Sequence, residues 1–247
     1  HDVPLYVLGG GFNTLVLDGG IEGVVLRTQR LREIEVSGDG LLYAESGVSH
    51  SQVTRVCQER ELTGLEFSAG IPGSVGGWVT MNAGIPDHEI GPLVAEIRVA
   101  TPSDGTLWIA REELRFEYRG VHGVPPGSVV LAAHFQLAAG EREQIRKQID
   151  RHRAHRRNTQ PIDQPSCGSV FKNPPGEHAG RLIESAGLKG AREGGAQISS
   201  LHANFIVNTG NATAADVTAL IERARDAVRE QSGIELETEV HIVGRPG

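Results

Sequence analysis

Short apolar runs between glycines and charged positions predict that strands make up much of this chain. Such runs lie at residues 3–8, 15–17, 24–27, 33–36, 41–45, 94–100, 106–109, 129–137 and 203–208. Those between residues 94 and 137 are expected to share a mixed sheet. A further strand is predicted at residues 234–243, where apolar and charged residues alternate and the glutamates fall on one face. A charged face of that kind is normally exposed to solvent.

Apolar residues at helical spacing predict four helices among these strands. They are expected at residues 52–59, 141–157 and 179–186, and between Thr213 and Gly233. The first and the last begin with a capping box, formed by Ser49 with Gln52 and by Thr213 with Asp216. The last helix has the clearest apolar stripe and is expected to pack against a sheet.

Length and composition indicate a soluble globular protein of one or two domains, and two are preferred. The chain has 247 residues, of which 38% are hydrophobic and 22% are charged. A formal net charge of −7 argues against a nucleic-acid-binding protein. Cys57 and Cys167 form neither a disulfide framework nor a metal set, so the reducing cytoplasm is the simplest location. No apolar run reaches membrane-spanning length, and no membrane contact is expected.

Residues 64–84, GLEFSAGIPGSVGGWVTMNAG, are a candidate phosphate-binding segment. Glu66 is the only ionisable residue in it, and its glycines let backbone N–H groups approach a bound anion. The glycines that would form this cradle are Gly70, Gly73, Gly76 and Gly77. The alternative is an ordinary glycine-rich turn between two strands.

A second glycine cluster, Gly9, Gly10 and Gly11, follows the first predicted strand. A dinucleotide-binding βαβ unit needs a helix directly after its glycines, but residues 18–20 interrupt the chain too early for one. The triplet therefore indicates a phosphate-binding fold of another kind.

Reactive side chains are concentrated at residues 166–176, SCGSVFKNPPG. Ser169, Lys172 and Asn173 place a hydroxyl, an amine and an amide within five residues, a grouping suited to proton donation and oxyanion contacts. A serine after glycine is more often structural, and Cys167 has no local partner that marks it as a nucleophile. The arginines that end the preceding helix form either a solvated face or an anion contact.

Several motifs occur together in one order along the chain. They are LGGGFN, GLEFSAGIPGSVGGWVTMNAG, the pair Tyr118-Arg119, CGSVFKNPPG, AGRLIESAGLKG, GGAQISSLHANFIVNTGNAT and LETEVHIVG. In this combination the chain resembles the UDP-N-acetylenolpyruvoylglucosamine reductases, which make UDP-N-acetylmuramate for bacterial peptidoglycan. The motifs cover most of the chain, and the sequence CGSVFKNPPG resembles that of the family's shorter type.

The resemblance implies an α+β flavoprotein. Residues 1–140 would form a two-part FAD-binding region of the vanillyl-alcohol-oxidase type, and residues 141–247 a C-terminal α+β substrate-binding domain. FAD would be held non-covalently, because neither glycine loop has an evident histidine or cysteine for attachment. The residues implied to bind the cofactor are Gly9, Gly10, Gly11, Asn13, Gly70, Gly73, Ser74, Gly76, Gly77 and Asn82.

The resemblance also implies a reaction. NADPH would reduce FAD, and the enolpyruvyl ether of UDP-N-acetylglucosamine would then accept hydride at its methylene carbon. Ser169 would donate a proton to the neighbouring carbon, while Arg119 and Glu239 would stabilise the enol-like intermediate at the substrate carboxylate. A planar guanidinium suits that task because it can meet both carboxylate oxygens. The residues implied to bind the substrate are Tyr118, Lys172, Asn173 and His202.

The chain departs from the family pattern in places that concern the flavin. Phe12 and Val121 stand where the family usually has serine, and the family's strand and helix before the first glycine loop are expected to be missing from this sequence. The sequence is therefore expected to represent part of a longer protein. Two alternatives stay open, another FAD oxidoreductase of the same fold and a non-catalytic nucleotide-sugar-binding protein. A cytoplasmic monomer is expected.

Overall fold

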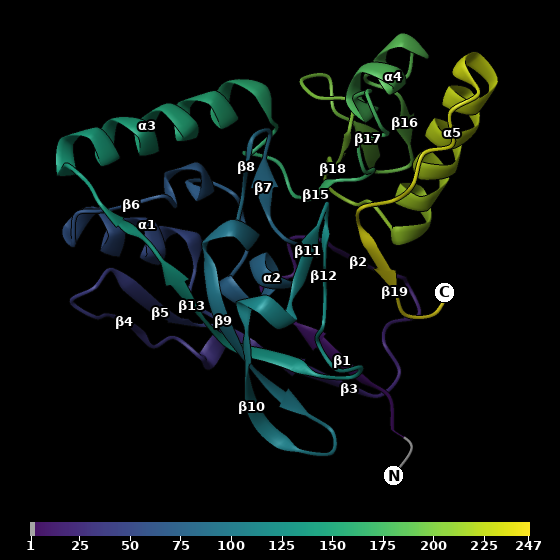
Figure 1. Ribbon diagram of the computed structural model, residues 1–247. Coiled ribbons are helices and arrows are strands. Elements are labelled where there is room, and N and C mark those ends of the chain that lie inside the picture. The colour runs from purple at the N-terminus through teal and green to yellow at the C-terminus, as the bar shows by residue number, and fades with distance from the viewer. Residues whose placement is uncertain (1–2) are drawn as a thin grey trace. The chain divides into compact units, whose positions relative to one another are not determined.

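The computed structural model describes residues 3–247. In it the chain folds into two compact units (Figure 1). The central unit contains Tyr6–Gly10 and Val25–His155. The C-terminal unit contains the residues up to Leu5, together with Gly11–Val24 and Arg156–Gly247. The first glycine cluster thus supplies residues to both units. The boundary placed between residues 140 and 141 stays a prediction.

A five-stranded antiparallel sheet dominates the central unit. In spatial order its strands are β10 (Gly105–Ala110), β9 (Val94–Thr101), β13 (Val129–Gln136), β5 (Leu41–Glu45) and β4 (Ile34–Val36). Every neighbouring pair is antiparallel, so the expectation of a mixed sheet is wrong. Strands such as β9 and β10 follow each other through a short turn, whereas a parallel pair needs a long crossover connection.

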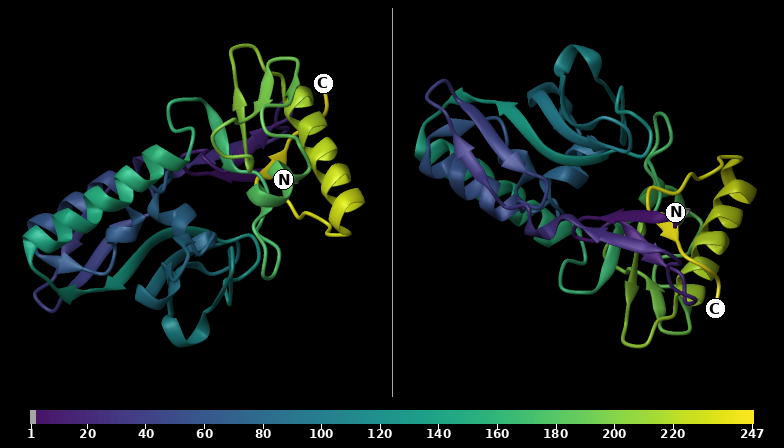
Figure 2. Two further views of the ribbon diagram at one scale, coloured as in Figure 1. Left: turned by 90° about the horizontal axis from the view of Figure 1, so that it is seen from above. Right: turned by 90° about the horizontal axis from the view of Figure 1, so that it is seen from below.

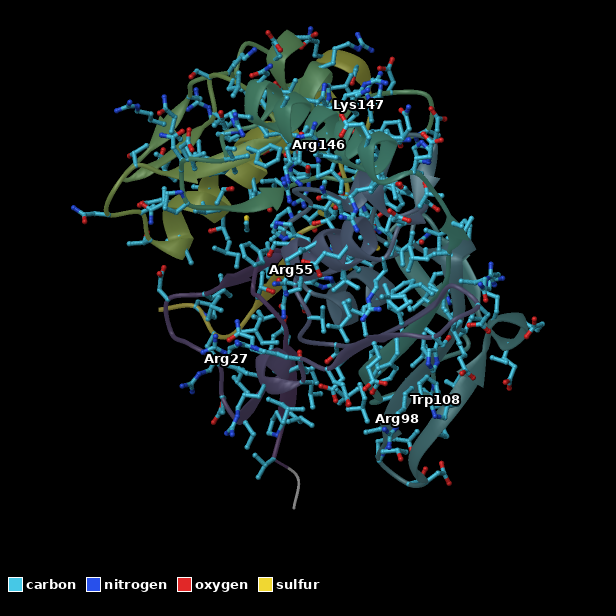
Figure 3. All side chains as sticks on the ribbon, turned by 90° about the vertical axis from the view of Figure 1, so that its left-hand side faces the viewer. Arg27, Arg55, Arg98, Trp108, Arg146 and Lys147 are labelled. Atoms are coloured by element: carbon cyan, nitrogen blue, oxygen red, sulfur yellow. The ribbon has the colours of Figure 1, made fainter. Side chains whose placement is uncertain are left out.

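The two faces of this sheet differ in polarity. On one face Trp108 lies opposite Arg98 on the next strand (Figure 3), and its ring centre is 4.9 Å from that of His134. Trp108 is 40% exposed, so this face is open in the central unit. The other face carries the core, which includes Leu42, Ala44, Ile97, Val99, Ala133 and Phe135.

Two helices, α1 (His50–Glu59) and α2 (Val75–Thr80), contribute to the same core. Helix α1 begins at the predicted capping box, in which Gln52 N donates to Ser49 Oγ at 3.4 Å and Ser49 N donates to Gln52 Oε1 at 3.1 Å. Helix α2 was not predicted, because glycine disfavours a helix by about 1 kcal/mol per residue and α2 contains Gly76 and Gly77. Burial of Val75, Trp78 and Val79 in the core outweighs that cost.

Short elements complete the central unit. They are η1 (Thr28–Arg30), β6 (Leu62–Thr63), η2 (Glu66–Ser68), β7 (Gly84–Ile85), β8 (His88–Glu89), η3 (Gly91–Leu93), η4 (Arg111–Glu113), β11 (Arg115–Glu117), β12 (Gly120–His122) and β14 (Ala138–Ala139). Strand β1 (Leu5–Leu8) pairs with β3 (Val24–Arg27). Helix α3 (Arg142–Thr159) agrees with the predicted helix and buries Ile145 and Ile149. No helix among residues 3–247 is both long and apolar enough to cross a membrane.

The C-terminal unit is built on a four-stranded antiparallel sheet. Its strands, in spatial order, are β15 (Ser166–Ser169), β18 (Phe205–Asn208), β17 (Ala196–Ile198) and β16 (Arg192–Glu193). Its helices are α4 (Ala179–Ser185) and α5 (Ala214–Ser232). Helix α5 begins at the predicted capping box of Thr213 and Asp216 and ends at Gly233, whose φ is 71°. It packs against β16 and β17, as expected, and both views of Figure 2 show it beside these strands.

The prediction of one continuous strand at residues 234–243 is wrong. Only β19 (His241–Val243) is a regular strand, and it pairs in parallel with β2 (Thr14–Val16). Upstream of β19 the chain is extended and runs along the loop after β15, where Thr238 forms a bridge with Phe171. The alternation of apolar residues still holds at Leu236 and Val240, which are buried, because the core lies on one side of this extended segment.

Candidate active site

The two glycine-rich segments meet in the central unit. A β-carbon at Gly9 would lie 3.1 Å from Ser74 Oγ, so the backbone before Gly10 passes directly against the second segment. Gly70 and Gly73 have φ angles of 88° and 126°, in the region that glycine adopts without strain. The sequence patterns alone left these segments separate, and their contact is the arrangement that a shared phosphate site requires.

Gly76 and Gly77 lie inside α2 and serve different purposes. A β-carbon at Gly76 would come within 2.7 Å of Ser46 Cβ, so close packing excludes a side chain there. At Gly77, which is exposed, no atom lies within 4 Å of the corresponding position. Backbone at Gly77 is therefore open to a bound group, whereas Gly76 is required by the fold.

Buried polar atoms without a partner cluster around this helix. Ser46 Oγ, Ser74 Oγ and Trp78 Nε1 are all buried and have no hydrogen-bond partner among the described residues. An unsatisfied buried polar group costs about 1–3 kcal/mol, so such groups are normally paired. Ser74 lies where the two glycine segments meet, so an acceptor oxygen of a diphosphate bound there would supply the missing partner of its hydroxyl. The residues present therefore fit a phosphate-bearing cofactor.

Tyr118 and Arg119 form the two-residue turn of the β11–β12 hairpin, in which Glu117 pairs with Gly120. Arg119 has a φ of 60°, a left-handed conformation that costs a residue with a β-carbon about 1–2 kcal/mol. Its guanidinium carbon lies 4.7 Å from the centre of the Tyr118 ring. The two-residue turn itself requires this conformation, and the catalytic role of Arg119 stays a prediction.

Asn82 lies at the end of the glycine-rich segment and is completely buried. Its side chain makes three hydrogen bonds within the central unit, with Glu89, Gly91 and Glu117. The side chain is thus committed to the protein, and the cofactor contact predicted for Asn82 would fall to its backbone.

Ser169 is the last residue of β15 in the C-terminal unit. The pairing of β15 with β18 is irregular between Ser166 and Ser169, and Gly168 has a φ of 78°. Such a bulge redirects the side chain that follows it. The next residues are fixed by Asn204, whose Oδ1 accepts from Phe171 N at 2.9 Å and whose Nδ2 donates to Phe171 O at 2.8 Å. The local pattern gave no signal for Asn204 as the support of this loop.

Glu239 lies beside the same loop. Its backbone N–H donates to Val170 O at 2.8 Å, which places Glu239 next to the residue that follows Ser169. Asn13 approaches from the first glycine loop, and its Nδ2 donates to Glu239 O at 3.1 Å. Segments far apart in the sequence therefore bring Ser169, Glu239 and Asn13 together in one unit. Glu239 is half-buried, unlike a residue on a normal solvent face.

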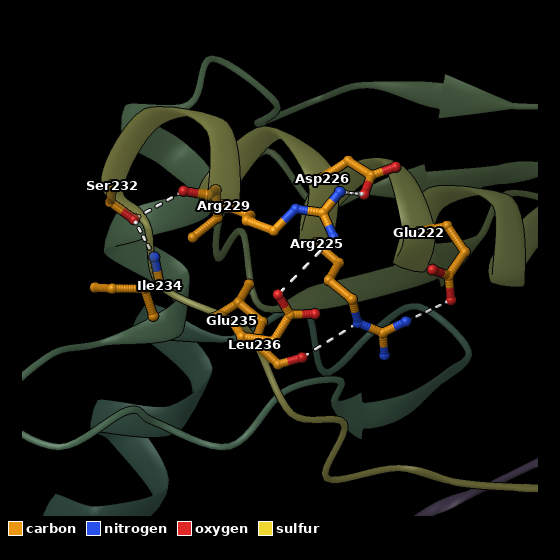
Figure 4. A network of polar contacts seen from close by, with 9 residues as sticks. Glu222, Arg225, Asp226, Arg229, Ser232, Ile234, Glu235 and Leu236 are labelled. Carbon is orange, nitrogen blue, oxygen red and sulfur yellow. Dashed lines mark hydrogen bonds and ion pairs between the residues drawn. The ribbon is translucent and has the colours of Figure 1, made fainter.

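The end of α5 holds the segment that leads to Glu239 (Figure 4). Arg225 Nε donates to Leu236 O at 3.2 Å, while its Nη1 pairs with Glu222 Oε1 at 2.6 Å. Arg229 binds Asp226 Oδ1 at 2.6 Å in the same network. The helix thus restrains the extended chain shortly before it reaches the candidate site.

Two other predicted substrate residues lie near this loop. Lys172 pairs with the Glu237 carboxylate, and the two backbones are joined by a bond of 2.9 Å from Lys172 N to Glu237 O. Asn173 Oδ1 accepts from the N–H of Ala179 at 3.1 Å, at the start of α4. Both side chains are therefore tethered on the loop that follows Ser169.

His202 is partly buried in the C-terminal unit. Burial, with the positive charge of Lys189 as a smaller cause, lowers the pKa of His202 below its ordinary value. Its Nδ1 accepts from Asn204 N at 3.2 Å, which leaves Nε2 as the protonated nitrogen of the neutral ring. His202 is therefore a hydrogen-bond donor at neutral pH rather than a cation.

The other candidates from the sequence, the Cys167 thiol and the arginines at the end of α3, have structural explanations. Burial raises the pKa of the Cys167 thiol, which disfavours the thiolate that a nucleophile needs. Arg151, Arg153 and Arg157 are exposed on α3, which agrees with a solvated face. Burial lowers the pKa of Arg156 to about 10, so its side chain remains charged at neutral pH.

The two departures from the family pattern are accommodated differently. Phe12 is 50% exposed, and its carbonyl oxygen would lie 3.3 Å from a β-carbon at Gly168. Val121 is partly buried against the core of the central unit. Neither side chain provides the hydroxyl that the family usually has at its position.

The predicted site residues are divided between the units. The central unit contains Tyr118, Arg119, Asn82 and most of the glycine cradle, while the C-terminal unit contains Gly11, Asn13, Ser169, Lys172, Asn173, His202 and Glu239. The contact between the glycine segments and the Ser74 hydroxyl, which has no partner among the described residues, indicate the class of proteins that bind a phosphate-bearing cofactor. A family model described as an FAD binding domain matches residues 1–111. A model of the UDP-N-acetylenolpyruvoylglucosamine reductase C-terminal domain matches residues 160–243.

The chain belongs to the UDP-N-acetylenolpyruvoylglucosamine reductase family. It is 50% identical to the reductase of Methylococcus capsulatus over 242 residues, which cover 98% of this chain and 79% of that protein. It is 46% identical to the reductase of Geotalea uraniireducens, over 98% of this chain and 80% of that protein. The crystal structure of the reductase from Thermus caldophilus superposes with a TM-score of 0.85 at 36% identity, covering 98% and 86% of the two chains. The resemblance and the fold class predicted from the sequence are confirmed.

Proposed function

We propose that this chain is an FAD-dependent reductase that converts UDP-N-acetylglucosamine enolpyruvate to UDP-N-acetylmuramate for peptidoglycan precursor synthesis, with NADPH as reductant. The observation that carries the proposal is the convergence of Ser169 and Glu239 within one unit of a reductase-family fold. Bound FAD would supply hydride transfer from NADPH to the methylene carbon of the substrate.

The central unit would hold most of the cofactor. Its diphosphate would lie against the backbone of Gly9, Gly10, Gly70, Gly73 and Gly77, where the two glycine segments meet. Ser74 Oγ, which is buried and has no partner among residues 3–247, would donate to a phosphate oxygen. From the C-terminal unit, Gly11 and Asn13 would complete the first loop. No residue of these loops is a histidine or cysteine, which supports non-covalent binding.

Ser169 would act as the proton donor. Hydride addition to the methylene carbon leaves negative charge on the neighbouring carbon and on the substrate carboxylate. The Ser169 hydroxyl would protonate that carbon, while the Glu239 carboxyl group, held beside the Ser169 loop, would share a proton with the carboxylate. The Arg119 guanidinium would stabilise the same negative charge with two hydrogen bonds.

Four further residues would bind the nucleotide sugar. Lys172 and Asn173 would contact the diphosphate, and binding would exchange the pairing of Lys172 with Glu237 for a phosphate contact. His202 would donate from Nε2 to a sugar or phosphate oxygen, and exposed Tyr118 would offer its ring and hydroxyl group. The protein is proposed to act as a cytoplasmic monomer.

The test is the flavin spectrum of the purified protein under anaerobic conditions. We expect a bound flavin that NADPH bleaches and that UDP-N-acetylglucosamine enolpyruvate returns to its oxidised spectrum without oxygen. A flavin that is reduced but not reoxidised by this substrate would refute the substrate assignment and favour another FAD oxidoreductase. A protein that binds the nucleotide sugar yet takes up no FAD would instead be a non-catalytic binding protein.

A further inference from the structure

The side chain of Asn82 joins three separate backbone segments in the central unit. Its Nδ2 donates to Glu89 Oε2 at 2.7 Å and to Glu117 O at 3.0 Å. Its Oδ1 accepts from Gly91 N at 2.9 Å. Asn82 is fully buried, so these bonds are shielded from water and removing them leaves buried groups unpaired.

Glu117 is the residue that directly precedes the Tyr118–Arg119 turn. The hairpin that carries this turn is a two-stranded sheet of its own, outside the five-stranded sheet of the unit. Isolated two-stranded hairpins are only marginally stable, so their position depends on contacts to the rest of the protein. The bond from Asn82 to the Glu117 carbonyl is such a contact, and it acts at the end of the hairpin nearest Arg119.

The surrounding packing fits the same role. A β-carbon at Gly91 would lie 2.6 Å from Phe116 Cγ and 3.0 Å from Asn82 Oδ1. Strand β11 therefore passes closely over Gly91 and Asn82, with no room for a larger residue. Asn82 itself has a φ of 40°, a left-handed conformation that asparagine adopts more readily than most residues.

We propose that Asn82 is a positioning residue that fixes the Tyr118–Arg119 turn relative to the glycine-rich segment. The inference rests on the proposed function, in which Arg119 binds the substrate carboxylate. Two hydrogen bonds from a guanidinium require placement within about 0.5 Å. Asn82 provides this placement from the segment that holds the cofactor, without itself touching the reacting atoms.

The test compares two replacements that keep the left-handed backbone. Asn82→Gly removes all three bonds without conformational strain, because glycine adopts positive φ freely. Asn82→Asp keeps the shape but loses the Nδ2 donor and places a second carboxyl group next to Glu89. In both variants we expect substrate-driven flavin reoxidation to slow by about 10- to 100-fold. Flavin content and flavin reduction by NADPH should stay within about twofold of the unmodified protein.

A matched control is Asn208→Asp in the C-terminal unit. Asn208 Oδ1 accepts from Gly210 N at 2.8 Å and from Ala212 N at 3.1 Å, and an aspartate can accept the same bonds. Both half-reactions should be unchanged in that variant. Hydrogen exchange of residues 115–122 is a second readout, independent of activity, and should be at least about fivefold faster in Asn82→Gly.

The outcomes separate the inference from the proposed function. Equal slowing of both half-reactions, or loss of flavin, would overturn the positioning role and make Asn82 a cofactor contact or a general structural residue. Unchanged reoxidation in Asn82→Gly would also overturn it. If the unmodified protein is not reoxidised by the substrate, the proposed function fails together with the catalytic part of the inference, while hydrogen exchange still decides whether Asn82 holds the turn.

Discussion

At the scale of single residues, the chemistry of the candidate site depends on polar groups whose surroundings are unusual. Arg119 has a left-handed backbone, Glu239 is half-buried on a segment whose other glutamates are exposed, and Ser74 Oγ has no partner among the described residues although it is buried. Each of these features costs free energy in the protein alone. A bound cofactor and substrate would offset those costs.

Replacing Ser169 with alanine should separate the two half-reactions. In the proposed mechanism, flavin reduction by NADPH needs no proton from Ser169, whereas reoxidation by the enolpyruvyl substrate does. We expect reoxidation to slow by about 10²- to 10⁴-fold, measured by anaerobic stopped-flow absorbance. Ser185→Ala, at the exposed end of α4 in the same unit, is the matched control and should leave both rates unchanged. Equal loss of both rates in Ser169→Ala would contradict the assigned role.

Cys57 should be unreactive in the folded protein. Burial, with the nearby negative charge of Glu66 as a smaller cause, raises the pKa of its thiol to about 12 from 9.0. At about pH 8, below either pKa, a thiol-specific reagent should label Cys57 only after unfolding, as mass spectrometry of the labelled peptide would reveal. Rapid labelling of the native protein would show that this part of the core opens easily.

The same pKa shift predicts how stability changes at alkaline pH. The unfolded thiol ionises near pH 9.0, whereas the folded thiol stays protonated up to about pH 12. Because the folded pKa is raised, the contribution of Cys57 is fully present below about pH 9 and is lost as the pH rises towards about 12. Denaturant unfolding of Cys57→Ala should show a weaker fall in stability over this range than the unmodified protein. If the stability of the two proteins fell equally with rising pH, this result would argue against the raised pKa of Cys57.

At the scale of secondary structure, helix α2 shows that adjacent glycines of one segment can have different surroundings. Gly76 has no room for a β-carbon, whereas Gly77 faces open space. Two adjacent glycines with the same sequence signal are thus distinguished only by their neighbours in the folded chain.

The two glycines of α2 should respond in opposite ways to alanine. Gly76→Ala would force a β-carbon against Ser46 and should lower the melting temperature of the flavin-free protein by several degrees. Gly77→Ala should stabilise the flavin-free protein by about 0.5–1 kcal/mol through helix propensity. Gly77→Ala should nevertheless weaken FAD binding, measured by fluorescence titration, because the new methyl group occupies the approach to the backbone. Unchanged FAD affinity would remove Gly77 from the predicted cradle.

Prediction from the sequence succeeded for elements with strong local signals and failed for several short ones. The capping boxes of α1 and α5 were predicted because the bonds join residues three positions apart. Strands β15, β16 and β17 and the β11–β12 hairpin were not predicted, since such short segments show no periodicity. For those elements the pairing partner, rather than the local sequence, determines the conformation.

At the scale of the whole molecule, cofactor binding and folding are linked. Any ligand that binds the folded state alone stabilises it, by about 2.7 kcal/mol when its concentration is about 100 times the Kd. Removing FAD should therefore lower the melting temperature, and adding FAD back should restore it in a concentration-dependent way. Adenosine monophosphate, which lacks the diphosphate and the flavin, is a suitable control ligand and should have a much smaller effect. A melting temperature independent of FAD would mean that the two glycine segments do not bind it.

The sequence by itself determined the family, the residue types of the candidate site and the longer helices and strands. These properties follow from glycine conformations, capping pairs, apolar spacing and the order of motifs, all of which are local in the chain. Only the tertiary structure decided that Gly9 lies against Ser74, that Glu239 lies beside the Ser169 loop, and that Asn82 is bonded to the residue before Tyr118. Such contacts depend on long-range pairing and core packing, because residues far apart in the chain approach one another only when apolar surfaces are buried together.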